Sequence, residues 1–234
     1  MALWGTMVNT LAIILASLLG FILPKLNENM HRTIIQAVGI FTCVLGVAMA
    51  LKSNEALFMV ISLALGGFLG ELMRIEGGFE KLGQWLEKKV GKAGGGTVGK
   101  AFVTSTLVFC IGAMAILGPI DGAIRHNHDL LYTKSIMDGL IALVLTSTMG
   151  LGVIFSAIAV LLYQGAIGIG ALWFASFFSP EVIQAVTLEV SAVGGILIIG
   201  VGLNLLEIKK VRVANLLPAL VIMAVLMGVS RLIG

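Results

Sequence analysis

The chain has 234 residues, of which 59% are apolar and 12% charged, and its formal net charge is +3. Its mean hydropathy is +1.08. A soluble globular domain is excluded because so few polar residues could not cover its surface. The 30 glycines and 4 prolines suit closely packed membrane helices. We therefore expect an all-α protein, a polytopic transmembrane helical bundle in which residues 1–234 form a single transmembrane domain.

Three apolar runs, each near the ~20 residues that cross the hydrocarbon core, open the chain at 3–23, 34–51 and 55–73. The first is too long for a typical signal peptide, and no Lys or Arg precedes Lys25, so we interpret it as the first span. Cys43 lies in the second run and Cys110 in a later one. We expect both cysteines to pack as small apolar side chains rather than to form a disulfide.

Residues 76–90, EGGFEKLGQWLEKKV, interrupt this apolar pattern. Apolar side chains recur there at helical spacing with charged residues opposite them: Phe79, Leu82, Leu86 and Val90, with Trp85 beside them. The pattern predicts a short amphipathic helix at the cytoplasmic interface. A solvated linker helix is the alternative.

The segment GGGTVGKA at 94–101 matches part of a phosphate-binding loop. Such a loop needs a preceding strand and a Ser or Thr after its Lys, whereas Ala101 follows Lys100 and an apolar run begins at once. We therefore expect no nucleotide and no other cofactor, and interpret the glycines as a flexible linker.

The second half contains five further candidate spans, at 101–120, 136–163, 166–180, 186–206 and 213–233. No charged residue marks a turn within 139–180, so we place the turn at Tyr163-Gln164-Gly165. Gly150 and Gly152 offer a break within the fifth span. The short, Gly-rich sixth segment either spans the membrane or is re-entrant.

The HNHD sequence at 126–129 offers two histidines and an aspartate as metal ligands. A tetrahedral site needs more ligands in a fixed geometry. A solvated extracytoplasmic loop is therefore favoured, and no metal is expected.

The Lys and Arg residues indicate the orientation. With eight crossings, eleven fall on one side and four on the other: Lys25, Arg32, Arg74, Lys81, Lys88, Lys89, Lys92, Lys100, Lys209, Lys210 and Arg212, against Lys52, Arg125, Lys134 and Arg231. The positive-inside rule then places the larger group in the cytoplasm and both termini outside.

Two weak internal similarities suggest a repeat. An offset of 182 residues aligns the first apolar hairpin with the last: Gly20, Ala37, Ile40, Gly46 and Val47 coincide with Gly202, Ala219, Ile222, Gly228 and Val229. LGGFLGE at 65–71 also resembles LGPIDGA at 117–123. Transporters often combine internal repeats with broken helices near the midplane, so broken or short helices are expected here.

Three carboxylates, Asp121, Asp138 and Glu189, are predicted towards the outer half of the membrane. Charged groups there are costly and usually line a cavity. Asp138 follows Lys134 by four residues, so the two share a helix face, and an ion pair at the helix end is the alternative. Asp121 follows Gly-Pro-Ile, where it could cap a broken helix.

Other polar residues lie nearer the cytoplasmic face: Glu71, Gln164 and Asn204. Asn9 and Gln36 add uncharged polarity to the first hairpin. Together with the three carboxylates, Glu71, Gln164 and Asn204 are the candidate ion- or substrate-binding residues. Each has a simpler reading as a helix–helix hydrogen bond.

Three segments carry a resemblance to a known family: FVTSTLVFCIGAMAILGPIDG at 102–122, KSIMDG at 134–139 and GLGVIFSAIAVLLYQG at 150–165. Over essentially its whole length the chain resembles the YqgA/YdfK-type bacterial inner-membrane proteins, a family of unknown function often labelled as transport proteins. The resemblance implies a bacterial cytoplasmic membrane location and transport. It supplies no catalytic residues.

A secondary transporter of a small ion or solute, proton- or cation-coupled, is the favoured function. An oligomeric channel and a non-transporting scaffold or sensor subunit are the alternatives. We do not expect an enzyme, because no nucleophile–base pair or metal set has workable spacing. The expected partners are the lipid bilayer and the small ion or solute, not nucleic acid, and the Gly-rich faces would permit a homodimer.

Overall fold

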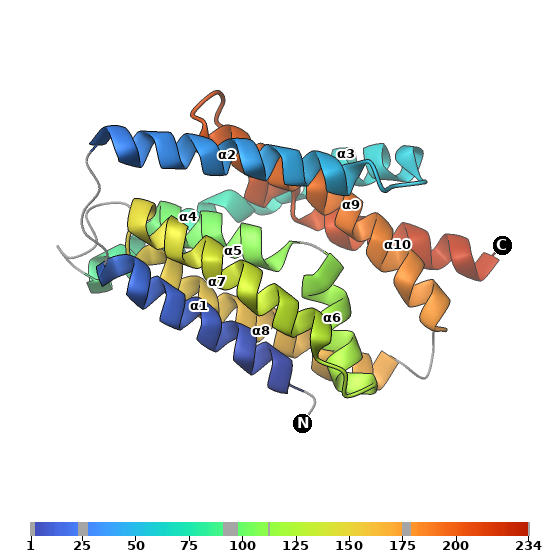
Figure 1. Cartoon of the computed structure of the whole chain (residues 1–234). Helices are drawn as coiled ribbons and strands as arrows, with labels where there is room; N and C mark the ends of the chain where they lie inside the picture. Colours follow the sequence, from blue (N-terminus) through green and yellow to red (C-terminus); the bar gives the residue numbers. More distant parts are fainter. Residues whose placement is uncertain (1–2, 23–27, 91–97, 112, 175–178, 234) are drawn as a thin grey trace. The chain divides into compact units, whose positions relative to one another are not determined.

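A computed structural model describes the chain except for residues 1–2, 23–27, 91–97, 112, 175–178 and 234 (Figure 1). Every regular element of the described residues is helical, which confirms the all-α prediction. The helices are α1 (Trp4–Ile22), α2 (Glu28–Ala50), α3 (Ala56–Met73), α4 (Ile75–Val90), α5 (Val98–Cys110), α6 (Ala113–Ile124), α7 (Asp129–Met149), α8 (Gly152–Phe174), α9 (Pro180–Leu205), the 3₁₀ turn η2 (Val213–Leu216) and α10 (Pro218–Ile233).

Seven described helices are long and apolar enough to cross a membrane, and an eighth span results if α5 and α6 count as one. These two short helices follow each other with a bend of 58°. The single apolar run predicted at 101–120 is therefore a broken pair of helices. The helix predicted at 76–90 is also present, as α4.

The chain divides into two compact units. Unit 1 comprises Met1–Ile35, Phe79–Cys110 and Met114–Phe174, and unit 2 comprises Gln36–Gly78, Ile111–Ala113 and Ala175–Gly234. Helices α2 and α4 contribute residues to both. A single transmembrane domain over the whole chain stays a prediction.

In unit 1, α1 packs against α7 and α8, and α5 packs against α8. Small residues permit the close approach of α1 to α7. A Cβ atom on Gly20 would lie 2.5 Å from the carbonyl oxygen of Leu143, so only glycine fits there. Further along the same interface, Gly139 faces Ala12 and Ala16. The contact brings the polar residues of α1 onto the face of α7.

In unit 2, α10 packs against α3 and α9. The second half of α2 contacts α9 through a pair of glycines, since a Cβ on either Gly46 or Gly195 would lie 2.5 Å from the other's carbonyl oxygen. The free thiol of Cys43 lies at the same interface, 3.9 Å from the carbonyl oxygen of Ile199.

The predicted turn at Tyr163-Gln164-Gly165 is wrong, because these residues lie inside the continuous helix α8. The chain turns instead at Gly150, whose φ of 88° favours glycine. Here α7 ends at Met149 and α8 begins at Gly152. The predicted spans 136–163 and 166–180 are thus replaced by two helices of similar length, 129–149 and 152–174.

Candidate functional site

The most deeply placed charges of unit 1 are on α7. Asp138 is the tenth of the 21 residues of this helix, so it lies at the middle of a candidate span rather than near one of its ends. Lys134 lies one helical turn earlier, and its Nζ is 2.9 Å from Oδ1 and 2.8 Å from Oδ2 of Asp138. The exposed fractions of the two side chains are only 8% and 5%. The alternative of an ion pair at the helix end is therefore wrong.

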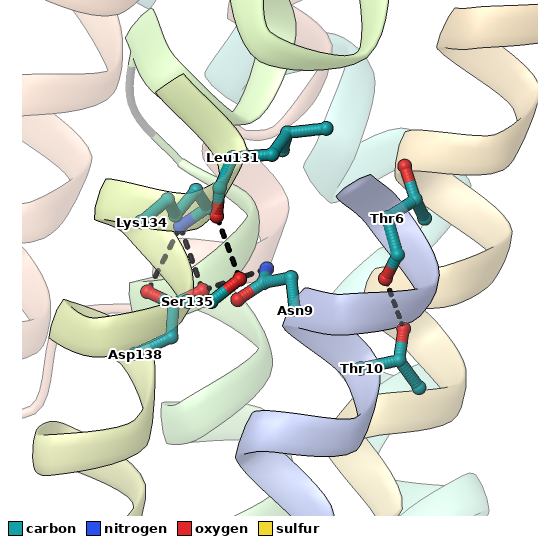
Figure 2. A network of polar contacts seen from close by, with 7 residues as sticks. All are labelled: Thr6, Asn9, Thr10, Leu131, Lys134, Ser135 and Asp138. Carbon is teal, nitrogen blue, oxygen red and sulfur yellow. Dashed lines mark hydrogen bonds and ion pairs between the residues drawn. The ribbon is translucent and has the colours of Figure 1, made fainter. Parts of the chain in front are cut away.

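Helix α1 supplies the third member of this site. Asn9 is fully buried, and its Nδ2 donates a hydrogen bond of 3.0 Å to Oδ2 of Asp138. Ser135, beside Lys134, donates its hydroxyl to the carbonyl oxygen of Leu131 at 2.6 Å. Figure 2 shows the Asn9 amide pointing toward Asp138 and Ser135. We call Asn9, Lys134 and Asp138 the Asp138 cluster.

One further titratable group lies near the Asp138 cluster, and a second lies near the first. Cys110, the last residue of α5, interacts electrostatically with both Lys134 and Asp138. Tyr163 of α8 interacts in turn with Cys110. The carboxyl end of α5, where the broken pair bends, therefore lies close to the ion pair.

The energetics of the ion pair do not favour a purely structural role. Each charge costs roughly 2.5–3.5 kcal/mol at the centre of a membrane helix on insertion scales. A buried pair is often no more stabilising than apolar residues of similar volume. Its retention in the middle of α7 needs another reason, and binding of a polar ligand is one.

Several buried polar atoms of unit 1 have no hydrogen-bond partner among the described residues. They are Thr6 Oγ1, Asn9 Oδ1, Ser17 Oγ, Thr106 Oγ1, His128 Nδ1, Thr146 Oγ1 and both amide atoms of Gln164. Buried polar groups are nearly always satisfied by protein or water. These atoms could therefore bind water or a ligand.

Two other predicted site residues lie in unit 1. Gln164 is fully buried in α8. Asp121 of α6 is partly exposed and lies 3.5 Å from the guanidinium of Arg125, one turn later. This is an ordinary helix-surface pair, and within the described residues no hydrogen bond or ion pair joins it to the Asp138 cluster.

The remaining three, Glu189, Asn204 and Glu71, make contacts within unit 2. The buried carboxylate of Glu189 accepts hydrogen bonds from the Ser53 hydroxyl at 2.5 Å and the Asn54 backbone N–H at 2.9 Å. It thereby fastens the α2–α3 loop to α9.

Asn204 at the end of α9 exchanges two hydrogen bonds with the backbone of Val211, of 2.9 and 2.7 Å. Glu71 at the end of α3 accepts from Arg212 and Asn215, each at 2.6 Å. Both residues hold the segment between α9 and α10 in place.

The HNHD segment forms the turn before α7. Asn127 Oδ1 accepts a hydrogen bond from the Asp129 backbone N–H, and His128 occupies the residue before the helix. Within the described ranges, no three His, Cys, Asp or Glu side chains gather in a metal-binding group.

Sequence reasoning found the Lys134–Asp138 pair through its spacing, but it treated Asn9 only as uncharged polarity. It did not predict Cys110 as a neighbour of the pair or Tyr163 as a neighbour of Cys110. The one sequence signal for Asn9 is an amide within an otherwise apolar run. Its partner, 129 residues away, depends on the packing of α1 against α7.

Comparison with known proteins adds the family. The chain is similar to the Uncharacterized membrane protein YdfK of Bacillus subtilis (strain 168), with 33% identity over 99% of each chain. It is also similar to the Uncharacterized protein YqgA of Escherichia coli (strain K12), with 25% identity over 93% of each chain. No solved structure matches. The length of the apolar helices and the name of the first relative both indicate a membrane protein. Residues 4–228 match the family described as "Protein of unknown function (DUF554)", and the chain belongs to that family.

Proposed function

We propose that this protein is a secondary transporter of a small ion or solute in the bacterial cytoplasmic membrane. The observation that supports this function best is the Asp138 cluster, a buried ion pair with a bound amide at the middle of a candidate span. Intramembrane charges of this kind usually mark a substrate or ion pathway.

The break between α5 and α6 supports the same proposal. In secondary transporters, substrate and ion sites commonly lie near the midplane where a helix is discontinuous. Here the end of α5 at Cys110 is within electrostatic reach of Lys134 and Asp138. A ligand at the cluster would interact with both the ion pair and the helix end.

The unpartnered polar atoms of unit 1 support the proposal that its interior binds a polar ligand. Asn9 Oδ1 belongs to the Asp138 cluster and is buried without a hydrogen-bond partner in the described part of the chain. A bound ligand, or water that a ligand displaces, would satisfy this oxygen. We propose that alternating access opens this site first to one membrane face and then to the other, with no enzymatic step.

Flux into proteoliposomes tests the proposal. The full chain is reconstituted, and the uptake of ²²Na⁺ and the movement of protons, followed with a trapped pH dye, are measured. A transporter gives saturable flux, whereas a channel gives unsaturated, voltage-driven current. We expect Asp138→Asn to reduce flux at least tenfold and Asp129→Asn, at the exposed start of the same helix, to leave it unchanged. Equal flux in the two variants would remove the Asp138 cluster from the transport pathway.

A further inference from the structure

We propose that the Asp138 cluster binds a small α-amino acid as a zwitterion, with the ligand's ammonium group on Asp138 and Asn9 and its carboxylate on Lys134. This proposal rests on the transporter function and names its substrate class. The features that support it are the charge of the site, its unused hydrogen-bonding atoms, the distance between its two charges and the small residues beside it.

The charge of the site favours a ligand that carries both signs. Lys134 and Asp138 are the only charged side chains among the buried described residues of unit 1, and together they are neutral. A lone cation or a lone anion would leave a net charge in the interior, which is costly there. A zwitterion adds no net charge, and each of its ends meets a side chain of opposite sign.

Acceptor oxygens for an ammonium group lie between α1 and α7, where the side chains of Asn9, Ser135 and Asp138 meet (Figure 2). Asn9 Oδ1 is buried and has no hydrogen-bond partner within the described residues. The Ser135 hydroxyl donates its proton to Leu131, so its own lone pairs remain acceptors. Because these oxygens accept N–H hydrogen bonds, the ligand should carry a primary ammonium group rather than a quaternary one.

Donor groups for a carboxylate are present in the same cluster. The Lys134 ammonium has three N–H groups. Its contacts with Oδ1 and Oδ2 of Asp138 leave a donor for a second carboxylate. The Asn9 amide nitrogen has two N–H groups and gives one of them to Asp138. Hydrogen bonds from such donors to a carboxylate are charge-assisted and are the stronger kind.

The spacing of the two charges favours an α-amino acid over a longer zwitterion. Lys134 Nζ lies 2.9 Å from Oδ1 and 2.8 Å from Oδ2 of Asp138, so the two charges are in contact. In an α-amino acid a single carbon separates the ammonium and carboxyl groups, so its charges can lie alongside the ion pair in the opposite order. A longer chain between the charges would let the ligand reach only one member of the pair.

The surroundings of the ion pair favour a small ligand. Both charged side chains are buried, so the ligand must fit within the interior of unit 1. Gly139, the residue after Asp138, faces Ala12 and Ala16 of α1, and a Cβ on Gly139 would lie no closer than 3.8 Å to either of them. The space here accepts a methyl group but not a large side chain. Glycine, alanine and serine are ligands of this size.

The carboxyl end of α5 adds negative potential near the pair. The last carbonyl groups of a helix have no partner within the helix, and the helix dipole places negative partial charge at this end. Cys110 ends α5 and interacts electrostatically with Lys134 and Asp138. This potential favours the ligand's ammonium group beside Asp138.

Binding to the purified full chain in detergent tests the ligand class. The melting temperature is followed during titration with L-alanine, and equilibrium dialysis with tritiated L-alanine gives the Kd. Each comparison ligand lacks one feature: propionate lacks the ammonium group, ethylamine the carboxylate and glycine betaine the N–H donors, while 6-aminohexanoate separates the charges. We expect L-alanine to raise the melting temperature, and each comparison ligand to bind at least about tenfold more weakly.

Two substitutions should change the ligand preference rather than only weaken binding. Lys134→Met leaves the Asp138 carboxylate without its counter-charge, so it should lose L-alanine binding and bind ethylamine at least about tenfold more tightly than the wild type. Asp138→Asn leaves the Lys134 ammonium unpaired, so it should lose L-alanine binding and gain propionate binding. A misfolded variant would gain neither ligand. If neither variant folds, the comparison of ligands on the wild type still tests the proposal.

Asn9→Leu tests the third member of the cluster. It removes the unpartnered oxygen and should weaken L-alanine binding about tenfold. Asp129→Asn, at the exposed start of α7, is the matched control and should bind L-alanine as the wild type does.

Two results would overturn the substrate class. One is a wild type that responds to none of L-alanine, glycine and serine, or that binds propionate or ethylamine as tightly as L-alanine. The other is tighter binding of glycerophosphoethanolamine, which would assign the site to a lipid headgroup with the same two charges. In both cases Asp138-dependent flux of Na⁺ or protons would retain the transporter. L-alanine binding without any flux of L-alanine, Na⁺ or protons into proteoliposomes would instead retain the site and reject the transporter.

Discussion

At the scale of single residues, the Asp138 cluster combines an ion pair within one helix with a hydrogen bond from a helix distant in the sequence. Lys134 and Asp138 meet because they are four residues apart on one helix. Asn9 completes the cluster from α1, 129 residues earlier in the sequence. The spacing made the ion pair predictable, but the amide partner was not, since nothing in a single sequence states which helix packs on α7.

The ion pair predicts a characteristic pattern of stability. Asp138→Leu leaves Lys134 buried without a counter-charge and should lower the free energy of unfolding by about 3–5 kcal/mol. Adding Lys134→Met removes the stranded charge, so the double variant should regain most of that loss. Unfolding in mixed detergent micelles would measure both, and additive losses would contradict the coupling of the two side chains.

Asn204 tests whether a predicted site residue has only a structural role. Its two hydrogen bonds to Val211 fix the segment after α9. Asn204→Leu should therefore reduce the free energy of unfolding by about 1–3 kcal/mol. Flux per folded molecule, normalised by the monodisperse fraction in size-exclusion chromatography, should stay unchanged. Lost flux in fully folded protein would instead assign Asn204 to the pathway.

At the scale of helices, apolar length predicted most elements, and the turns between them were harder to predict. The spans at 3–23 and 55–73 correspond closely to α1 and α3 because charged or polar segments bound them. Between 139 and 180 no charge is present, and the polar pair Tyr163-Gln164 was taken for a turn although it lies within α8. The true turn is at Gly150, which the sequence offered only as a break within one span, and its positive φ is a conformation that glycine favours.

Helix packing predicts opposite effects for two glycines of unit 1. Gly20→Ala introduces a methyl group against the Leu143 carbonyl oxygen of α7 and should cost about 1–3 kcal/mol of unfolding free energy. Gly170→Ala in α8 meets no atom within 4 Å and should be neutral or stabilise by up to about 1 kcal/mol. The same micelle unfolding experiment compares them. Equal effects would mean that α1 does not approach α7 as closely as described.

At the scale of the whole molecule, the number of crossings depends on the broken pair α5 and α6. In the described part of the chain, seven helices are long enough to span, and the bent pair either supplies an eighth crossing or forms a re-entrant loop. Moving the turn from 163–165 to Gly150 leaves the charge distribution unchanged, because residues 139–180 carry no charge. The prediction that the N-terminus lies outside therefore stands on the same lysines and arginines as before, except Lys134, which lies within α7.

Charge alone does not decide between eight crossings and seven. If the bent pair did not cross, Arg125 and Arg231 would move to the cytoplasmic side, while three residues would move outside: Lys209, Lys210 and Arg212. Lys134 lies in the middle of α7 and counts for neither side. The two arrangements then differ by a single charge in the positive-inside total, which is too little to discriminate between them.

The position of the C-terminus does decide, because an even number of crossings returns it to the side of the N-terminus. With eight crossings, a C-terminal alkaline phosphatase fusion should be active and a C-terminal green fluorescent protein fusion dark. A cysteine replacing Lys209 should then be protected from a membrane-impermeant maleimide in whole cells, and one replacing Lys52 should be labelled. A fluorescent C-terminal fusion together with a labelled residue 209 would make α5 and α6 a re-entrant loop. The broken pair near Asp138 would then enter and leave on one side of the membrane, so a transported ligand would reach Asp138 from that side without a full crossing by this pair.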